Sequence, residues 1–205
     1  MEIMYFRKLK NTDDIDEIAE WIYSTEEFLC NILFKDKIQS ITALGRLIQS
    51  QHINPYHKSF ITLICDDETD QPMGVSVSFK GSQISSKETY KAFVETSCSN
   101  TFLIMGGLIG CEFFASKIGT KDYYIGNLYV DEKHRHKHLG SKLVNKEKAN
   151  ASYLNCENVL LDVEYDKSYL LDFYGKLGFV EDSKNYHEVM GKTYGCYGLK
   201  YSLRD

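Results

Sequence analysis

Residues 133–138 form an unbroken run of six basic side chains in a chain with a net charge of −5. The segment before the run, 123–131, has the composition of a strand, and the segment after it, 141–154, has a helical pattern. The run therefore lies in a strand-to-helix turn, where free backbone N–H groups and the helix dipole attract anions. Gly140 permits a ligand to approach the backbone closely. The turn is typical of a phosphate or pyrophosphate site. The long cationic side chains of Arg135, Lys137 and Lys142 could also contact such an anion.

A metal ion and a nucleic acid are the alternative ligands for the same run. His134, His136 and His138 suggest a metal site, but alternate histidines share a face only on a strand, and no cysteine or carboxylate accompanies them at a ligand spacing. A nucleic-acid patch would need interleaved aromatic residues or a longer basic face. We therefore expect neither a metal nor a nucleic-acid partner, and a solvated loop without a ligand stays open.

Length and composition predict a single soluble domain over residues 1–205. The chain has 43% apolar and 26% charged residues, and its six cysteines form no C-x-x-C pair. With no secretory signal in the first ten residues, we expect a reduced, cytoplasmic protein. The longest apolar stretch, 102–115, is too short to span a bilayer and is interrupted by Glu112, so no membrane partner is expected. We interpret that stretch as a packed core segment, and its glycines also permit a nucleotide loop.

Periodicity and turn signals predict an α/β sandwich with a mixed sheet. The expected strands are 3–9, 59–66, 73–81, 123–131, 158–165 and 194–203. The expected helical segments are 11–24 with Asn11 or Thr12 as the N-cap, 27–51 with a break near Lys35, 85–116, 141–154 and 167–177.

Two ordered segments resemble the GNAT superfamily of N-acetyltransferases. "NLYVDEKHRHKHLGSKLV" (127–144) is similar to its acyl-CoA-binding signature, Arg/Gln-x-x-Gly-x-Gly/Ala, with Arg135 first and Gly140 last. "LLDVEYDKSYLLDFYGKLGFVE" (160–181) resembles the following strand, a helix with a "YxKLGF" ending and the next strand. The upstream segments resemble a bacterial-type subgroup with a long helical insertion. The resemblance implies a GNAT-like mixed, largely antiparallel sheet flanked by helices on both faces.

Two residues depart from the family pattern. His138 stands where the family has its first glycine, and Lys167 stands where an asparagine is common. If the turn needs a positive φ at residue 138, a histidine there costs about 1 kcal/mol. The alternative is that the His138 imidazole binds a phosphate.

The resemblance implies an acetyl-CoA-dependent N-acetyltransferase in which a primary amine attacks the thioester directly within a ternary complex. The Leu128 N–H is expected to face the thioester carbonyl, Tyr129 and Val130 to contact the pantetheine arm, and Tyr174 to protonate the leaving thiolate. Packing on the sheet is the alternative role for Tyr174. The expected pyrophosphate cradle consists of Arg135, His136, Lys137, His138, Leu139, Gly140, Ser141 and Lys142.

The sequence leaves the general base and the acceptor open. Asp122, Asp162 and Glu164 are candidates for the base, and the alternatives are a water chain or an amine that arrives neutral. A small-molecule amine is the expected acceptor, with a protein lysine or N-terminus as the alternative, and a homodimer stays open. Rival hypotheses are a non-catalytic acyl-CoA-binding or regulatory module and, more remotely, a metal-binding protein. Weak candidates for the acceptor pocket are Trp21, Tyr23, Glu26, Glu27, Phe28 and Glu188.

Overall fold

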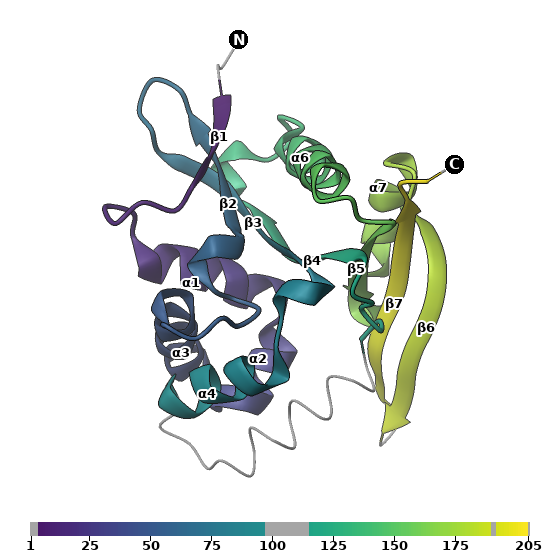
Figure 1. Ribbon diagram of the computed structural model, residues 1–205, viewed down its shortest axis with the longest axis horizontal. Coiled ribbons are helices and arrows are strands. Elements are labelled where there is room, and N and C mark those ends of the chain that lie inside the picture. The colour runs from purple at the N-terminus through teal and green to yellow at the C-terminus, as the bar shows by residue number, and fades with distance from the viewer. Residues whose placement is uncertain (1–3, 97–114, 190–191, 205) are drawn as a thin grey trace.

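A seven-stranded sheet with the strand order β1-β2-β3-β4-β5-β7-β6 organises the computed structural model, which describes residues 4–96, 115–189 and 192–204 (Figure 1). All neighbouring strands are antiparallel except β4 and β5, which are parallel. The mixed, largely antiparallel sheet is therefore confirmed. The strands are β1 (Met4–Lys8), β2 (Ile61–Asp66), β3 (Pro72–Lys80), β4 (Asp122–Val130), β5 (Asn158–Glu164), β6 (Val180–Val189) and β7 (Lys192–Ser202).

Helices cover both faces of this sheet, as expected (Figure 1). One group packs on the face formed largely by β2 and β3, and a second group packs on the opposite face. The first group is α1 (Ile15–Thr25), α2 (Glu27–Phe34), α3 (Lys37–Gln49) and α4 (Ser86–Thr96). The second group is α6 (Leu139–Tyr153) and α7 (Leu171–Lys176).

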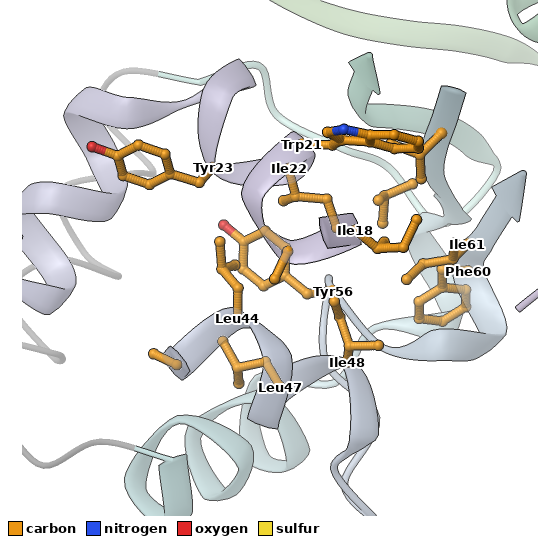
Figure 2. Close-up of a cluster of buried hydrophobic side chains, with 14 of the residues drawn as sticks. Ile18, Trp21, Ile22, Tyr23, Leu44, Leu47, Ile48, Tyr56, Phe60 and Ile61 are labelled. Carbon is orange, nitrogen blue, oxygen red and sulfur yellow. The ribbon is translucent and has the colours of Figure 1, made fainter. Parts of the chain in front are cut away.

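The core under the first group fixes the end of α1 beside β4. Ile18 and Ile22 of α1 are fully buried against Leu44 and Ile48 of α3 (Figure 2). Burying a side chain of this size contributes roughly 1.5–3 kcal/mol. Trp21 of α1 stacks on Tyr129 of β4, with ring centroids 5.7 Å apart. The last turn of α1 is thereby held over the open end of β4.

A buried polar cluster holds α6 on the other face. Glu147 is completely buried and accepts hydrogen bonds from the Ser76 hydroxyl at 2.7 Å, the Tyr123 hydroxyl at 2.6 Å and the Asn150 amide at 2.9 Å. These bonds compensate for the loss of water around the carboxylate. They connect α6 to β3 and β4, and α6 begins at the basic turn.

Several element boundaries differ from the sequence expectation. The N-cap of α1 is Asp14, not Asn11 or Thr12, and its carboxylate accepts from the Asp16 and Glu17 N–H groups at 3.0 and 3.1 Å. The predicted break near Lys35 is confirmed, since Lys35 adopts a φ of 85° between α2 and α3. The expected helix over 167–177 is a 3-10 helix, η4 (Tyr165–Leu170), followed by the short α7.

One strand was missing from the pattern-based prediction, and one apolar segment lies outside the structure. β6 has no alternation of polar and apolar residues, and only the family resemblance implied a strand there. The expected helix over 85–116 is confirmed for 86–96, while the apolar stretch 102–115 falls almost entirely outside the described residues. In the described part of the chain, no helix is long and apolar enough to cross a bilayer.

Candidate active site

The two parallel strands at the centre of the sheet pair for only part of their length. β4 and β5 pair from Asp122 and Asn158 up to Ile125 and Leu161. Beyond that point, β4 stays paired with β3 as far as Val130, while β5 stays paired with β7. The register of β3 and β4 shifts at Gly126, as at a β-bulge, which bends a strand and ends regular pairing. Beyond Ile125 and Leu161, the inner edges of both strands have no strand partner among the described residues, so their backbone groups can contact a ligand.

The opening between the strands is the mouth of a cleft of about 810 Å³. It brings together most of the predicted site residues from β4, the basic turn and α7. Lys137 and Lys142 do not line it, and Lys142 instead contacts Met4, with 3.0 Å between Nζ and Sδ. The predicted residues that line the cleft are Leu128, Tyr129, Val130, Arg135, His136, His138, Leu139, Gly140, Ser141 and Tyr174.

The basic turn forms an anion cradle at one end of this cleft. His136 and His138 both adopt left-handed conformations, with φ of 64° and 58°. His138 is the N-cap of α6, yet its side chain makes no capping hydrogen bond. The His138 side chain thus leaves the first-turn N–H groups of α6 available to a phosphate. A Cβ at Gly140 would lie 3.4 Å from the Phe173 ring, tighter than most such contacts, so the turn packs closely on α7.

Arg135 is oriented by contacts with β4. Its Nε donates to the Val130 carbonyl at 3.3 Å, and its guanidinium lies 5.7 Å from the centre of the Tyr129 ring. Nearly half of its side chain is exposed, and it also pairs with Glu132. The guanidinium is therefore positioned at the edge of the cleft, where it can contact an anion.

Tyr174 lies in the cleft wall between α7 and the sheet. Its ring packs edge-on against Phe173 and Phe179, at centroid distances of 4.9 and 5.9 Å. Burial raises the pKa of its hydroxyl to about 12, so the group stays protonated at neutral pH and can act only as a donor of a proton. Both expected roles, packing and proton donation, are compatible with this position.

The three carboxylates considered as bases occupy different positions. Asp122 does not line the cleft and accepts from the Gly119 N–H and the Asn158 amide, both at 2.8 Å. Asp162 lines the cleft but accepts from Ser116 and from the Tyr124 hydroxyl at 2.9 Å, which makes it a link between segments. Glu164 also lines the cleft, and burial raises the pKa of its carboxyl.

A fourth carboxyl group, Glu26, lies at the corner between α1 and α2, next to the cleft-lining Thr25 but not itself lining the cleft. Its Oε1 is buried without a hydrogen-bond partner among the described residues. Burial raises the pKa of this carboxyl to about 7, although hydrogen bonds from Tyr56 and Asn127 lower it. The sequence indicated only a charge near the acceptor pocket, because nothing local to residues 24–28 reveals the packing of β4 against this corner.

The remaining weak candidates are not gathered at the cleft. Trp21 and Tyr23 belong to the core of the first face, whereas Glu27, Phe28 and Glu188 are exposed. Among the described residues, no three histidine, cysteine, aspartate or glutamate side chains are grouped as metal ligands would be.

Comparison with known proteins agrees with this geometry. A family model described as an acetyltransferase (GNAT) domain matches residues 98–181. N-alpha-acetyltransferase 30 of Xenopus laevis is 33% identical over 101 residues, which make up 47% of this chain and 37% of that relative. The matched region thus spans little more than a third of the curated relative.

Solved structures resemble the chain over nearly its whole length. An N-acetyltransferase from Staphylococcus aureus Mu50 has a TM-score of 0.68 and 15% identity, covering 96% of this chain and 100% of that one. A structure of the NatC complex bound to Gag peptide and CoA has a TM-score of 0.58 and 15% identity, with 100% of both chains covered. At these identities the likeness shows the fold. Residues 98–181 are thus similar to a GNAT acetyltransferase domain, and the chain has the fold of solved N-acetyltransferases.

Proposed function

We propose that the protein is an acetyl-CoA-dependent N-acetyltransferase that acetylates a primary amine. The observation that carries this proposal is the cleft between β4 and β5, which combines an anion cradle, strand edges with free backbone groups and a buried phenol. The family match and the structural likeness support the same activity. A single elongated ligand such as acetyl-CoA would place its phosphates at the turn and its acyl group between the strands.

In the proposed reaction, the N–H groups at the start of α6 and the Arg135 guanidinium hold the pyrophosphate. The backbone of Tyr129 and Val130 aligns the pantetheine arm, and the Leu128 N–H polarises the thioester carbonyl. The neutral amine attacks the carbonyl carbon, a C–N bond forms, and the C–S bond breaks. Tyr174 gives its proton to the departing thiolate. The proton lost by the amine goes to a carboxylate, for which we propose Glu26 at the α1–α2 corner, a buried group next to the cleft-lining Thr25 that does not itself line the cleft. General acid catalysis of this kind contributes typically about 10²–10⁴-fold in rate.

We expect the acceptor to be a small molecule. Glu164 places a carboxyl group in the wall of the cleft, which suits a cationic substrate. The second candidate is a protein N-terminus, which the likeness to the frog N-alpha-acetyltransferase favours.

Two measurements test the activity. Calorimetric titration of tag-free protein should give micromolar binding of acetyl-CoA, with desulfo-coenzyme A and ATP as controls. The Tyr174→Phe variant should lose at least about 100-fold in kcat while acetyl-CoA affinity stays within about two-fold, because phenylalanine keeps the packing and removes the acid.

The control for that substitution is Tyr153→Phe, since Tyr153 is on α6 and is highly exposed. Selective acetyl-CoA binding without transfer to any amine would favour the non-catalytic acyl-CoA-binding module instead. No binding at all would exclude both proposals.

A further inference from the structure

Lys167 places a primary ammonium group inside the cleft, on the side away from the anion cradle. Its Nζ lies 2.5 Å from Glu164 Oε2 and donates to the Thr25 carbonyl oxygen at 2.8 Å. All three residues line the cleft, and only about a quarter of the Lys167 side chain is exposed, at 25%. A carboxylate and a carbonyl around one ammonium are the contacts that an alkylammonium ligand would receive.

The Thr25 carbonyl is well suited to hold a cation. Thr25 is the last residue of α1, where carbonyl groups lack partners within the helix and carry the negative end of its dipole. The Thr25 hydroxyl also accepts from the Asn127 amide of β4 at 2.8 Å. Asn127 directly precedes Leu128, the expected thioester contact. The ammonium of Lys167 is therefore linked to the reacting region through one residue and two hydrogen bonds.

The surroundings of Lys167 would attract another cation if its side chain were absent. Glu164 and Glu26 are close enough to affect one another, since the Glu164 charge raises the pKa of Glu26 and the Lys167 charge lowers it. Glu26 Oε1 is buried without a partner among the described residues. Removing the lysine would leave the Glu164 carboxyl group and the C-terminal carbonyl of α1 beside a space shaped for an unbranched alkyl chain, with the Glu26 charge nearby.

We propose that Lys167 occupies the binding subsite for the acceptor's ammonium group. An unbranched primary alkylammonium displaces the lysine and binds to Glu164 and to the Thr25 carbonyl. This inference rests on the proposed function and adds to it the class of acceptor and a built-in competitor. The alternative is that Lys167 only ties η4 to the end of α1.

The first experiment measures binding without turnover. Lys167→Ala removes the three methylene groups and the ammonium beyond Cβ, which n-propylammonium chloride would replace. We expect 50 mM n-propylammonium to raise the melting temperature of this variant by several degrees, and equimolar tetramethylammonium, which cannot donate a hydrogen bond, to have no effect. Lys167→Met fills the same space without charge and should show no such rise. Equal responses to the two salts, or a rise in Lys167→Met as large as in Lys167→Ala, would overturn the subsite.

The second experiment asks whether the subsite serves the acceptor. The KM of n-propylamine in thiol release should be at least ten-fold lower for Lys167→Ala than for the native protein, because no resident ammonium has to be displaced. The KM of alaninamide, a branched mimic of a protein N-terminus, should change less than three-fold. Adding Glu164→Gln to Lys167→Ala should reverse the gain for n-propylamine.

A matched control separates this effect from the loss of a lysine–glutamate pair in general. Lys91 pairs with Glu88 three residues away on α4, at 2.8 Å, and does not line the cleft, so Lys91→Ala should leave both KM values unchanged. An active native protein whose KM for n-propylamine is not lowered by Lys167→Ala would refute this inference alone. A native protein that neither binds acetyl-CoA nor releases thiol with any amine would refute the proposed function, while the melting experiment would still report on the ammonium subsite.

Discussion

His138 adopts a strained backbone conformation at the position where the resemblance to the acyl-CoA-binding signature implies a glycine. Its φ of 58° lies in the left-handed region, and no capping bond of its side chain compensates. His138→Gly removes this strain, although glycine also increases the freedom of the unfolded chain. We expect a gain of up to about 1 kcal/mol in unfolding free energy, with acetyl-CoA affinity kept or improved. Denaturant unfolding and calorimetry measure the two quantities.

Asn155 offers a control for that substitution. It has a φ of 53° just beyond the end of α6 and does not line the cleft. Asn155→Gly should leave acetyl-CoA affinity unchanged. A large loss of affinity in His138→Gly but not in Asn155→Gly would show that the imidazole itself contacts the phosphates.

Under the proposed function, Glu26 should set the lower limit of the pH range in which acetyl transfer occurs. Because burial raises the pKa of its carboxyl to about 7, the group gains its ability to accept a proton as the pH rises through neutrality. We expect kcat of the native protein to rise between pH 6 and pH 8, and Glu26→Gln to lower kcat and abolish that rise. The exposed neighbour Glu27 provides the control, since Glu27→Gln should keep the native profile.

The same raised pKa has a consequence for stability. The folded protein holds the Glu26 proton more tightly than the unfolded chain does, so this contribution to stability is complete below the ordinary value of 4.5 and is lost as the pH rises through about 7. The unfolding free energy of Glu26→Gln minus that of the native protein should therefore be more positive at pH 8 than at pH 5. A difference of the opposite sign would contradict the burial of a neutral carboxyl group.

At the scale of elements, α6 depends on one buried carboxylate for its position. Removing the Glu147 side chain leaves the Ser76 and Tyr123 hydroxyls buried without their acceptor. We expect Glu147→Ala to lower the unfolding free energy by about 3 kcal/mol, as leaving buried polar groups unpaired typically does. Chemical denaturation measures this loss, and Lys146→Ala on the same helix is the control. A loss no larger than that of the control would show that α6 is held by its apolar contacts alone.

The elements that could be predicted from the sequence are those with a local signal. The strand, basic turn and helix over 122–153 follow from composition, and so does the break near Lys35. The predicted N-cap of α1 was wrong because several polar residues, Asn11 to Asp14, can take that role. Only the tertiary path of the chain selects Asp14. β6 was missed by the pattern because its residues are polar on both faces.

The candidate site was predictable on its coenzyme side and not on its acceptor side. The turn and Tyr174 each lie within one continuous sequence motif, whereas the Asn127–Thr25 contact joins residues 102 positions apart. The contact of Lys167 with Thr25 spans 142 positions. Such contacts depend on how α1 packs over the open end of β4, which no local pattern encodes.

At the scale of the whole molecule, the cleft separates two groups of strands that share few direct contacts. β1 to β4 and β5 to β7 are joined within the sheet only by the four residue pairs of β4 and β5 among the described residues. A ligand bound between these strands contacts both groups and stabilises the folded state by mass action. At a concentration of 100 Kd, acetyl-CoA should add about 2.7 kcal/mol to the unfolding free energy.

Thermal unfolding with and without acetyl-CoA measures this gain, with ATP as the control ligand. A single cooperative transition is what the predicted single domain over 1–205 requires. Two separate transitions, of which acetyl-CoA shifts only one, would contradict both the single domain and a ligand shared by the two strand groups.

β6 forms one edge of the sheet and pairs only with β7 in the described part of the chain. A free edge of ten residues is a template on which another chain can add a strand, and β-rich aggregates grow in this way. Alternating threonine or valine would make the edge attractive to other chains, whereas the acidic and basic residues of β6 make such pairing unfavourable. The charged residues that hide this strand from pattern analysis thus disfavour edge-to-edge aggregation. Substitutions that replace them with uncharged β-forming residues would be expected to promote the growth of β-rich fibrils from this edge.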